Sequence, residues 1–204
     1  MALANYTDLK AAVASWMNRT DLTSAIPDFI ALAEGRIARD MRLRSQVTET
    51  TLSTVAGTQT VALPDGIVEI ENISVVANPN RPLSVITPEQ MDFKYPDSFW
   101  TSQPSHYSII GSTLHLGPTP DAVYSLQLAY YGRITALATT STNALLTSHP
   151  IIYLAASLSE GYLYLKDTDA AALWNDRYRS AKDSLQQSDD SLLRSGSQMR
   201  VRAL

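Results

Sequence analysis

Residues 106–134 decide the fold, and they read HYSIIGSTLHLGPTPDAVYSLQLAYYGRI. Glycine at the first position of a two-residue turn suits a type II′ hairpin, so the turn is predicted at Gly111-Ser112. That turn pairs Ile109 with Leu114 and Tyr107 with Leu116, and all four residues fall on one apolar face. The following run, YSLQLAYY, also alternates, with its apolar face formed by Tyr124, Leu126, Leu128 and Tyr130. The stretch therefore predicts a three-stranded meander with one buried side.

Short runs of β-forming residues precede this stretch. They are VTETTLSTV, TQTVAL, VEIENISVV and PLSVI, and Ala-Gly, Pro-Asp-Gly and Asn-Pro-Asn turns separate them. Thr87-Pro88-Glu89-Gln90 has the pattern of a capping box and predicts a short helical turn. Residues 94–105 are rich in proline and aromatic residues and predict a loop.

The pattern is helical on both sides of the β segment. A helix is predicted over residues 7–18, capped by Thr7, and a longer one over residues 24–43 with the apolar stripe Ile26, Ile30, Ala33, Ile37 and Met41. After residue 145, Ser148 is predicted to cap a third helix, with the stripe Ile151, Leu154, Ala155, Leu158, Tyr162 and Leu165. A break at Asp167-Thr168 leads to a fourth helix, with the stripe Trp174, Tyr178, Ala181 and Leu185.

Together these patterns predict an α+β fold, in which an antiparallel β domain is inserted into a helical bundle. Neither helix pair can bury its stripe alone, so residues 1–44 and 145–190 are expected to pack together. The β domain is assigned to residues 45–134 and a connector to residues 135–144. The composition changes after Asp190, and residues 191–204 are expected to form a C-terminal arm outside the bundle.

Composition excludes several classes of protein. The chain has 204 residues, a net charge of −4 and no cysteine, which excludes disulfides and thiolate metal sites and gives no general basic footprint for nucleic acid. Neither a signal peptide nor a membrane span is expected, so the protein is expected to be made and used without export.

No catalytic, cofactor-binding or metal-binding residue is predicted. The common nucleotide, hydrolase and metalloprotease motifs do not occur in the sequence. His106 and His115 fall diagonally on the polar face of the hairpin without a clear third ligand, and His149 lies beside a helix cap. Glu69 and Glu71 share a predicted strand face, which favours a solvated surface and leaves a glycosidase pair as the alternative.

Two groups of residues are candidates for interfaces with other molecules. The first comprises arginines at the end of the second helix and aromatic residues of the loop: Arg36, Arg39, Arg42, Arg44, Tyr95, Phe99 and Trp100. The arginines suit a helix C-terminus, but they exceed what the helix dipole requires, so an acidic partner is the alternative. The second group interleaves basic and apolar residues in the C-terminal arm, a composition typical of a segment that orders on a partner: Leu192, Leu193, Arg194, Met199, Arg200, Val201, Arg202 and Leu204.

The order of these segments resembles phage head-to-tail adaptor proteins, which join the portal of a capsid to the tail. The resemblance begins with NYTDLKAAVASWMNR and IPDFIALAEGRIARDMR. It continues through VALPDGIVEIENISVV, RPLSVITPEQMD and YSIIGSTLHLGPTPDAVYSLQLAYY, and ends with NALLTSHPIIYLAASLSEGYLYLKDTDAAALWNDRYRSAKDSL. Each segment alone is generic, but their combination and order are specific.

The resemblance implies a non-enzymatic virion protein, without cofactors, made in the bacterial cytoplasm and placed at the head-tail junction. It implies a ring of about twelve copies around a channel through which DNA passes. The C-terminal arm would reach the portal protein, and the rest would face a tail or nozzle protein. Two alternatives remain: a tail-associated carbohydrate-binding or hydrolytic module using Glu69 and Glu71, and a DNA-binding protein using residues 36–44.

Overall fold

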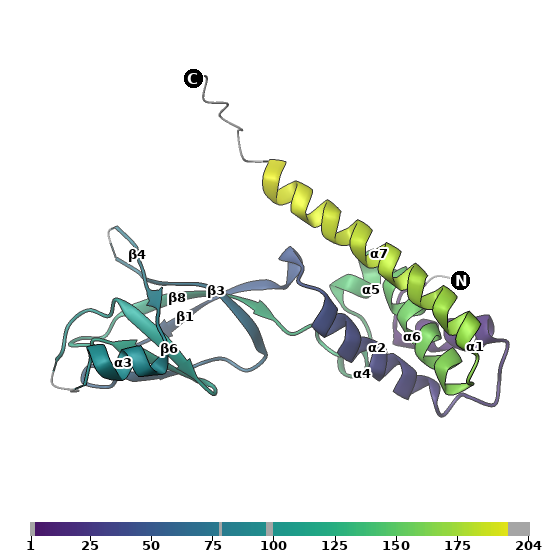
Figure 1. The fold of residues 1–204 in the computed structure, drawn as a ribbon, viewed down its shortest axis with the longest axis horizontal. Coiled ribbons are helices and arrows are strands. Elements are labelled where there is room, and N and C mark those ends of the chain that lie inside the picture. The colour runs from purple at the N-terminus through teal and green to yellow at the C-terminus, as the bar shows by residue number, and fades with distance from the viewer. Residues whose placement is uncertain (1–2, 78, 97–99, 196–204) are drawn as a thin grey trace, which may run out of the picture. The chain divides into compact units, whose positions relative to one another are not determined.

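The chain folds into two compact units, shown in a computed structural model that describes residues 3–77, 79–96 and 100–195, with side chains described as far as Ser191 (Figure 1). The first unit combines Met1–Ser45 with Ile134–Leu204, and the second is Gln46–Arg133. The described elements of the first unit are helical, and those of the second are strands and one α-helix, which gives the predicted α+β class.

The first unit is built around α6 (Pro150–Tyr164), which packs against four of its other helices. These are α1 (Tyr6–Met17), α2 (Ile26–Asp40), α5 (Ala144–Ser148) and α7 (Thr168–Ser195); a short α4 (Leu137–Thr140) precedes α5. Every side chain of α6 from Ile152 to Ser159 is buried. A helix that is apolar on all sides belongs in the centre of a core. The single stripe predicted for this helix is therefore too narrow, and Ile151, which it included, is 40% exposed.

Two of the predicted helix caps are wrong. The α1 cap is Asn5, whose Oδ1 accepts a hydrogen bond from the Asp8 amide at 2.9 Å, so the helix starts before Thr7. Ser148 does not cap α6, because it ends α5, a helix capped by Asn143. The predicted break before α7 is confirmed: Lys166 has a φ of 60°, and Asp167 accepts a hydrogen bond from the Ala170 amide at 3.0 Å.

The five-residue stripe predicted for α2 is confirmed, since all its members are buried. The helix ends at Asp40, three residues earlier than predicted, because Met41 is extended with φ −128° and ψ 138°. The chain then passes through a 3₁₀ turn, Arg44–Gln46, towards the second unit.

Helix α7 continues beyond Asp190, where the sequence pattern predicted its end. Its backbone is helical as far as Ser195, the last residue described there, and residues 190–195 contain neither glycine nor proline. Trp174 and Tyr178 are buried on its inner face. Within its unit, the C-terminal end of α7 extends beyond the other helices (Figure 1).

The second unit contains two four-stranded sheets among its described residues. One has the order β1 (Val47–Ser53), β8 (Ser125–Gly132), β3 (Ile67–Val75), β4 (Arg81–Pro82). The other has the order β2 (Thr60–Ala62), β7 (Thr113–Gly117), β6 (His106–Ile110), β5 (Ser84–Val85). Helix α3 (Pro88–Lys94) packs on β6 and has the predicted capping box at Thr87.

The β6–β7 hairpin has the predicted register, with Ile109 opposite Leu114 and Tyr107 opposite Leu116. Ile109 is nevertheless 41% exposed, because it lies close to the turn. The meander is wrong: β8 pairs with β1 and β3 in the other sheet. Two prolines between β7 and β8 interrupt any hydrogen-bonded ladder. The leucines of both elements still share one core, formed by Ile73, Val75, Leu83, Tyr107, Leu114, Leu116, Leu126 and Leu128.

Strand β3 departs from simple alternation. Its pairing with β8 shifts register between Ile67 and Glu69 and again between Ile70 and Asn72. Each extra residue moves the inward position by one, so isoleucines three residues apart point to the core side. Glu69 and Glu71 are both exposed, but Glu71 lies within the second shift, between Ile70 and Asn72, so simple alternation does not give their geometry.

No helix in the described part of the chain is both long and apolar enough to cross a membrane.

Candidate interaction surfaces

Arg36 is held inside the first unit and is not an open interface residue. Its guanidinium donates to Ser159 Oγ at 3.3 Å and to Asn175 Oδ1, and it lies 3.6 Å from an Asp40 oxygen. It also lies 3.7 Å from Glu160 Oε1 and stacks on the Tyr178 ring with its Cζ 4.3 Å from the centroid. These partners belong to α2, α6 and α7, so Arg36 ties three helices together.

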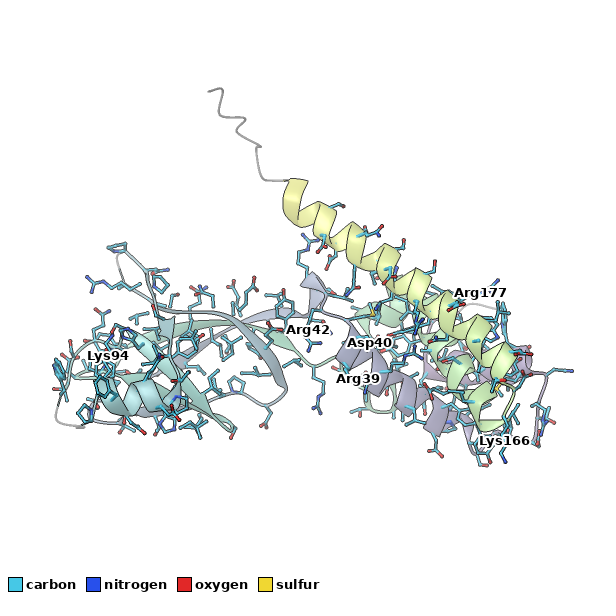
Figure 2. The ribbon with its side chains drawn as sticks, in the orientation of Figure 1. Arg39, Asp40, Arg42, Lys94, Lys166 and Arg177 are labelled. Carbon is cyan, nitrogen blue, oxygen red and sulfur yellow. The ribbon has the colours of Figure 1, made fainter. Side chains whose placement is uncertain are left out.

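The remaining arginines of the group differ in their exposure and contacts; Arg39 and Arg42 are labelled in Figure 2. The Arg39 side chain is 76% exposed and lies 3.7 Å from Asp40 Oδ1. Arg42 donates to the carbonyls of Ala38 and Met41 at 2.8 and 2.9 Å, which satisfies the C-terminus of α2. The Arg39 side chain is thus largely open to solvent, and more exposed than that of Arg44, which is 56% exposed.

Arg44 joins the end of the α2 segment to α7. Its backbone N–H donates to Asp189 Oδ2 at 2.7 Å, and its Nε lies 3.9 Å from Asp189 Oδ1. One carboxylate therefore holds both the backbone and the side chain of Arg44. Asp189 and Arg44 are 145 residues apart in the sequence, so no local pattern reveals their contact.

The C-terminal candidates stay predictions. Leu192, Leu193 and Arg194 lie on the helical backbone of α7, but their side chains are outside the described part of the chain. The other candidates, Met199, Arg200, Val201, Arg202 and Leu204, lie outside the described residues altogether.

The aromatic residues of the loop divide into anchored and exposed ones. Tyr95 is partly buried and forms the C-cap of α3, whereas Trp100 is 64% exposed. Their rings meet edge to face with centroids 6.1 Å apart. Phe99 lies outside the described residues.

The interpretation of the sequence missed Phe93, which is 91% exposed on α3. Together with Ile86, Glu89, Gln90 and Lys94 it lines a groove of about 490 Å³. Met91 is the buried residue of α3, and Phe93 lies two positions after it. At 100° per residue, Phe93 therefore points to the opposite side of the helix, so its exposure could have been predicted. An aromatic ring so exposed adds a surface candidate in the second unit.

His106 is engaged with protein neighbours at both ring nitrogens. Its Nε2 lies 2.8 Å from Lys94 Nζ, and its Nδ1 lies 2.8 Å from Ser105 Oγ and 2.9 Å from Tyr95 Oη. Burial and the Lys94 charge lower the pKa of His106. His115 lies opposite Ser108, diagonal to His106 as expected. Among the described residues, no three histidine, aspartate or glutamate side chains are grouped to hold a metal.

The β3 carboxylates do not form a shared cavity. Glu69 and Asp65 line a depression of about 340 Å³ together with apolar residues of the β2–β3 loop and the β6–β7 turn, and Glu71 is not part of its lining. A paired-carboxylate site requires both groups to face one substrate. The geometry gives no specific support to the carbohydrate alternative.

A partly buried cluster of polar groups holds the start of the second segment of the first unit, which begins at Ile134. The Leu137 amide donates to Glu34 Oε1 at 2.7 Å, and Asn143 donates to Tyr153 Oη at 2.8 Å. Burial raises the pKa of Glu34. Burial, with the nearby Glu34 carboxylate, raises the pKa of Tyr153 to about 12. These groups fasten α4 and α5 to the core, which is a structural role.

Comparison with known protein families gives a match over nearly the whole chain. The chain matches the family model of the SU10 adaptor protein over residues 4–202, which includes both units. It belongs to this family of phage adaptor proteins. No curated protein matches the chain significantly.

Membership of the SU10 adaptor family agrees with the surfaces described above. A phage adaptor is a structural component of the virion, and its partners are other structural proteins of the phage. The polar groups of this SU10 adaptor homologue are used mainly to hold helices and strands together, as at Arg36, Glu34 and His106. Arg39, Phe93 and Trp100 provide charged and aromatic surface that is open to partners.

Proposed function

We propose that this protein forms a ring at the head-tail junction, with the portal protein on one side and a tail or nozzle protein on the other. About twelve copies would surround the channel, following the portal's symmetry. The observation that carries the proposal is the family match over residues 4–202. DNA would pass through without sequence-specific binding, and the net charge of −4 avoids a generally basic, retentive surface.

The C-terminal segment is the proposed contact with the portal. Helix α7 extends beyond the other helices of its unit and leads into residues 196–204 (Figure 1). That segment contains Arg200 and Arg202 with Met199, Val201 and Leu204 between and after them, and the family match reaches residue 202. Alternating cations and apolar side chains can combine charge attraction with burial when such a segment orders on a partner.

A ring also needs two different patches on each copy, each complementary to the other patch on the neighbouring copy. In the first unit, the exposed Arg39 is a candidate contact; in the second, Phe93 and Trp100 are candidates for the neighbouring copy or for the tail protein. Arg36 is not a candidate, because its contacts are already made within the unit.

The portal contact is tested with a chain truncated after Ser195 and with the double variant Arg200→Gln, Arg202→Gln. Binding to isolated portal rings of the same phage is measured by cosedimentation. Both variants should keep the circular dichroism spectrum of the full chain. The truncated chain should lose portal binding, and the double variant should bind more weakly and with a smaller dependence on salt, because it lacks charges that salt would screen. Normal portal binding by the truncated chain would show that the arm is not the contact.

A further inference from the structure

A directed chain of hydrogen bonds crosses from α3 to the β6–β7 hairpin. The Lys94 ammonium can only donate, so His106 Nε2, 2.8 Å away, must accept. The neutral ring then carries its proton on Nδ1, which faces Ser105 Oγ at 2.8 Å. Ser105 in turn donates to the Gly117 carbonyl at 3.5 Å. The direction of every step follows from the single fact that lysine has no acceptor.

The same place is packed as well as hydrogen-bonded. Tyr95 Oη also approaches His106 Nδ1, at 2.9 Å, and the two rings are 5.8 Å apart. A Cβ on Gly117 would overlap the Tyr95 ring and come within 2.6 Å of Met91 Sδ, so the end of α3 lies directly on β7. Because the packing is this close, a change in the protonation of His106 alters the contacts of α3.

The charged groups around His106 are few. Lys94 faces it from α3 and Tyr95 from the helix cap, and both are described above. Across the sheet its strand partners are Gly117 on β7 and Ser84 on β5, which carry no charge, and His115 lies diagonally on β7. Among the described residues, no carboxylate shifts the pKa of His106, so none of them offsets a second positive charge there.

We propose that Lys94 and His106 form a pH-sensitive latch, which fastens the last turn of α3 to the β6–β7 hairpin and releases it when His106 takes up a proton. The added proton occupies Nε2, the atom that accepts from Lys94, and places two cations within hydrogen-bond distance. That contact cannot persist, so the Lys94 side chain leaves and the Tyr95 cap loosens, while the buried Met91 keeps the rest of α3 in place.

The release also changes the surface. Lys94 lines the groove that contains Phe93, so the groove wall moves with the latch. The latch lies within the second unit and is independent of the proposed ring.

The latch is tested on the full chain by NMR between pH 5 and pH 8. At neutral pH the His106 ring nitrogens should show the proton on Nδ1. Protection of the Tyr95 amide, which donates to the Met91 carbonyl at 2.8 Å, should fall by about fivefold as His106 titrates, after correction for intrinsic exchange. The Leu116 amide, which donates to Gln59 in the same unit, should keep its protection.

Two variants separate the latch from general acid sensitivity. Lys94→Met should raise the His106 midpoint, though not fully, because burial remains; the control Lys166→Met, in the other unit, should leave it unchanged. His106→Gln can still accept from Lys94 and should make Tyr95 protection independent of pH. A proton on Nε2 at neutral pH, or Tyr95 protection that stays constant through the His106 titration, would overturn the proposal.

Discussion

At the scale of single residues, similar side chains in one short stretch have different roles. Arg36 and Arg39 are three positions apart, yet one contacts three helices and the other faces solvent. The sequence could not separate them, because the Arg36 partners Ser159, Glu160 and Asn175 lie more than 120 positions away. The exposure of Phe93, by contrast, could be predicted, because it lies two positions after Met91 in a short helix.

Arg36→Met should lower the free energy of unfolding by about 2 kcal/mol or more. The substitution leaves Glu160 without the Arg36 cation, Asp40 with only the exposed Arg39 beside it, and Asn175 without its donor. Charged hydrogen bonds contribute about 1.5–3 kcal/mol each. Urea unfolding followed by tryptophan fluorescence measures the change. The matched control Arg39→Met should cost less than about 0.5 kcal/mol. Equal losses in the two variants would contradict the internal role of Arg36.

Glu34→Gln should change how stability depends on pH. The pKa of Glu34 is raised by burial, so the folded state binds more protons than the unfolded state between the ordinary and the raised value. The stability of the natural protein therefore falls as pH rises through that window. Glutamine keeps an oxygen for the Leu137 amide but does not ionise. Urea unfolding from pH 4 to pH 8 should show the variant gaining relative stability with pH, and a constant difference would refute this.

At the scale of elements, local patterns predicted registers well and partners poorly. The β6–β7 pairing was predictable because Gly111 specifies the turn and a tight turn specifies the register. The partner of β8 was not, because sequence neighbours pair in only about two-thirds of cases and a strand's own pattern does not identify its sheet. The bulges of β3 could not be predicted either, because an extra residue leaves no distinct pattern in an exposed strand of mixed polar and apolar residues.

Gly117→Ala should weaken the packing of α3 on the β6–β7 hairpin. The new methyl group would overlap the Tyr95 ring and Met91 Sδ, and overpacking of this kind costs about 1–3 kcal/mol. The matched control is Gly35→Ala on α2, where nothing lies within 4 Å of the added carbon. That change should stabilise by about 0.5–1 kcal/mol through helix propensity. Urea unfolding of both variants checks the signs, and a neutral Gly117→Ala would show that α3 is not closely seated.

At the scale of the whole molecule, each unit has its own core. Buried clusters centred on α6 in one unit and on Leu114, Leu116, Leu126 and Leu128 in the other share no residue. The approximate division was predictable, because the periodicity changes near residues 45 and 134. The continuation of α7 was not, because the composition of residues 191–195 suggested an arm while their propensities allow a helix.

The second unit should fold when expressed alone as Gln46–Arg133. Val47 pairs with Tyr131, so the excised chain begins and ends on neighbouring strands and no strand is cut. Its amide NMR spectrum should be dispersed and should overlay the corresponding signals of the full chain. A collapsed spectrum typical of an unfolded chain would show that the unit depends on the helices for its stability.

The proposed function requires that this adaptor assembles as a ring on the portal. The most direct measurement is electron microscopy of portal rings from the same phage, mixed with the full chain. We expect an added ring with about twelve copies of the adaptor, coaxial with the portal and open at its centre. Portal rings that remain bare at saturating adaptor, or adaptor copies bound without ring symmetry, would contradict it.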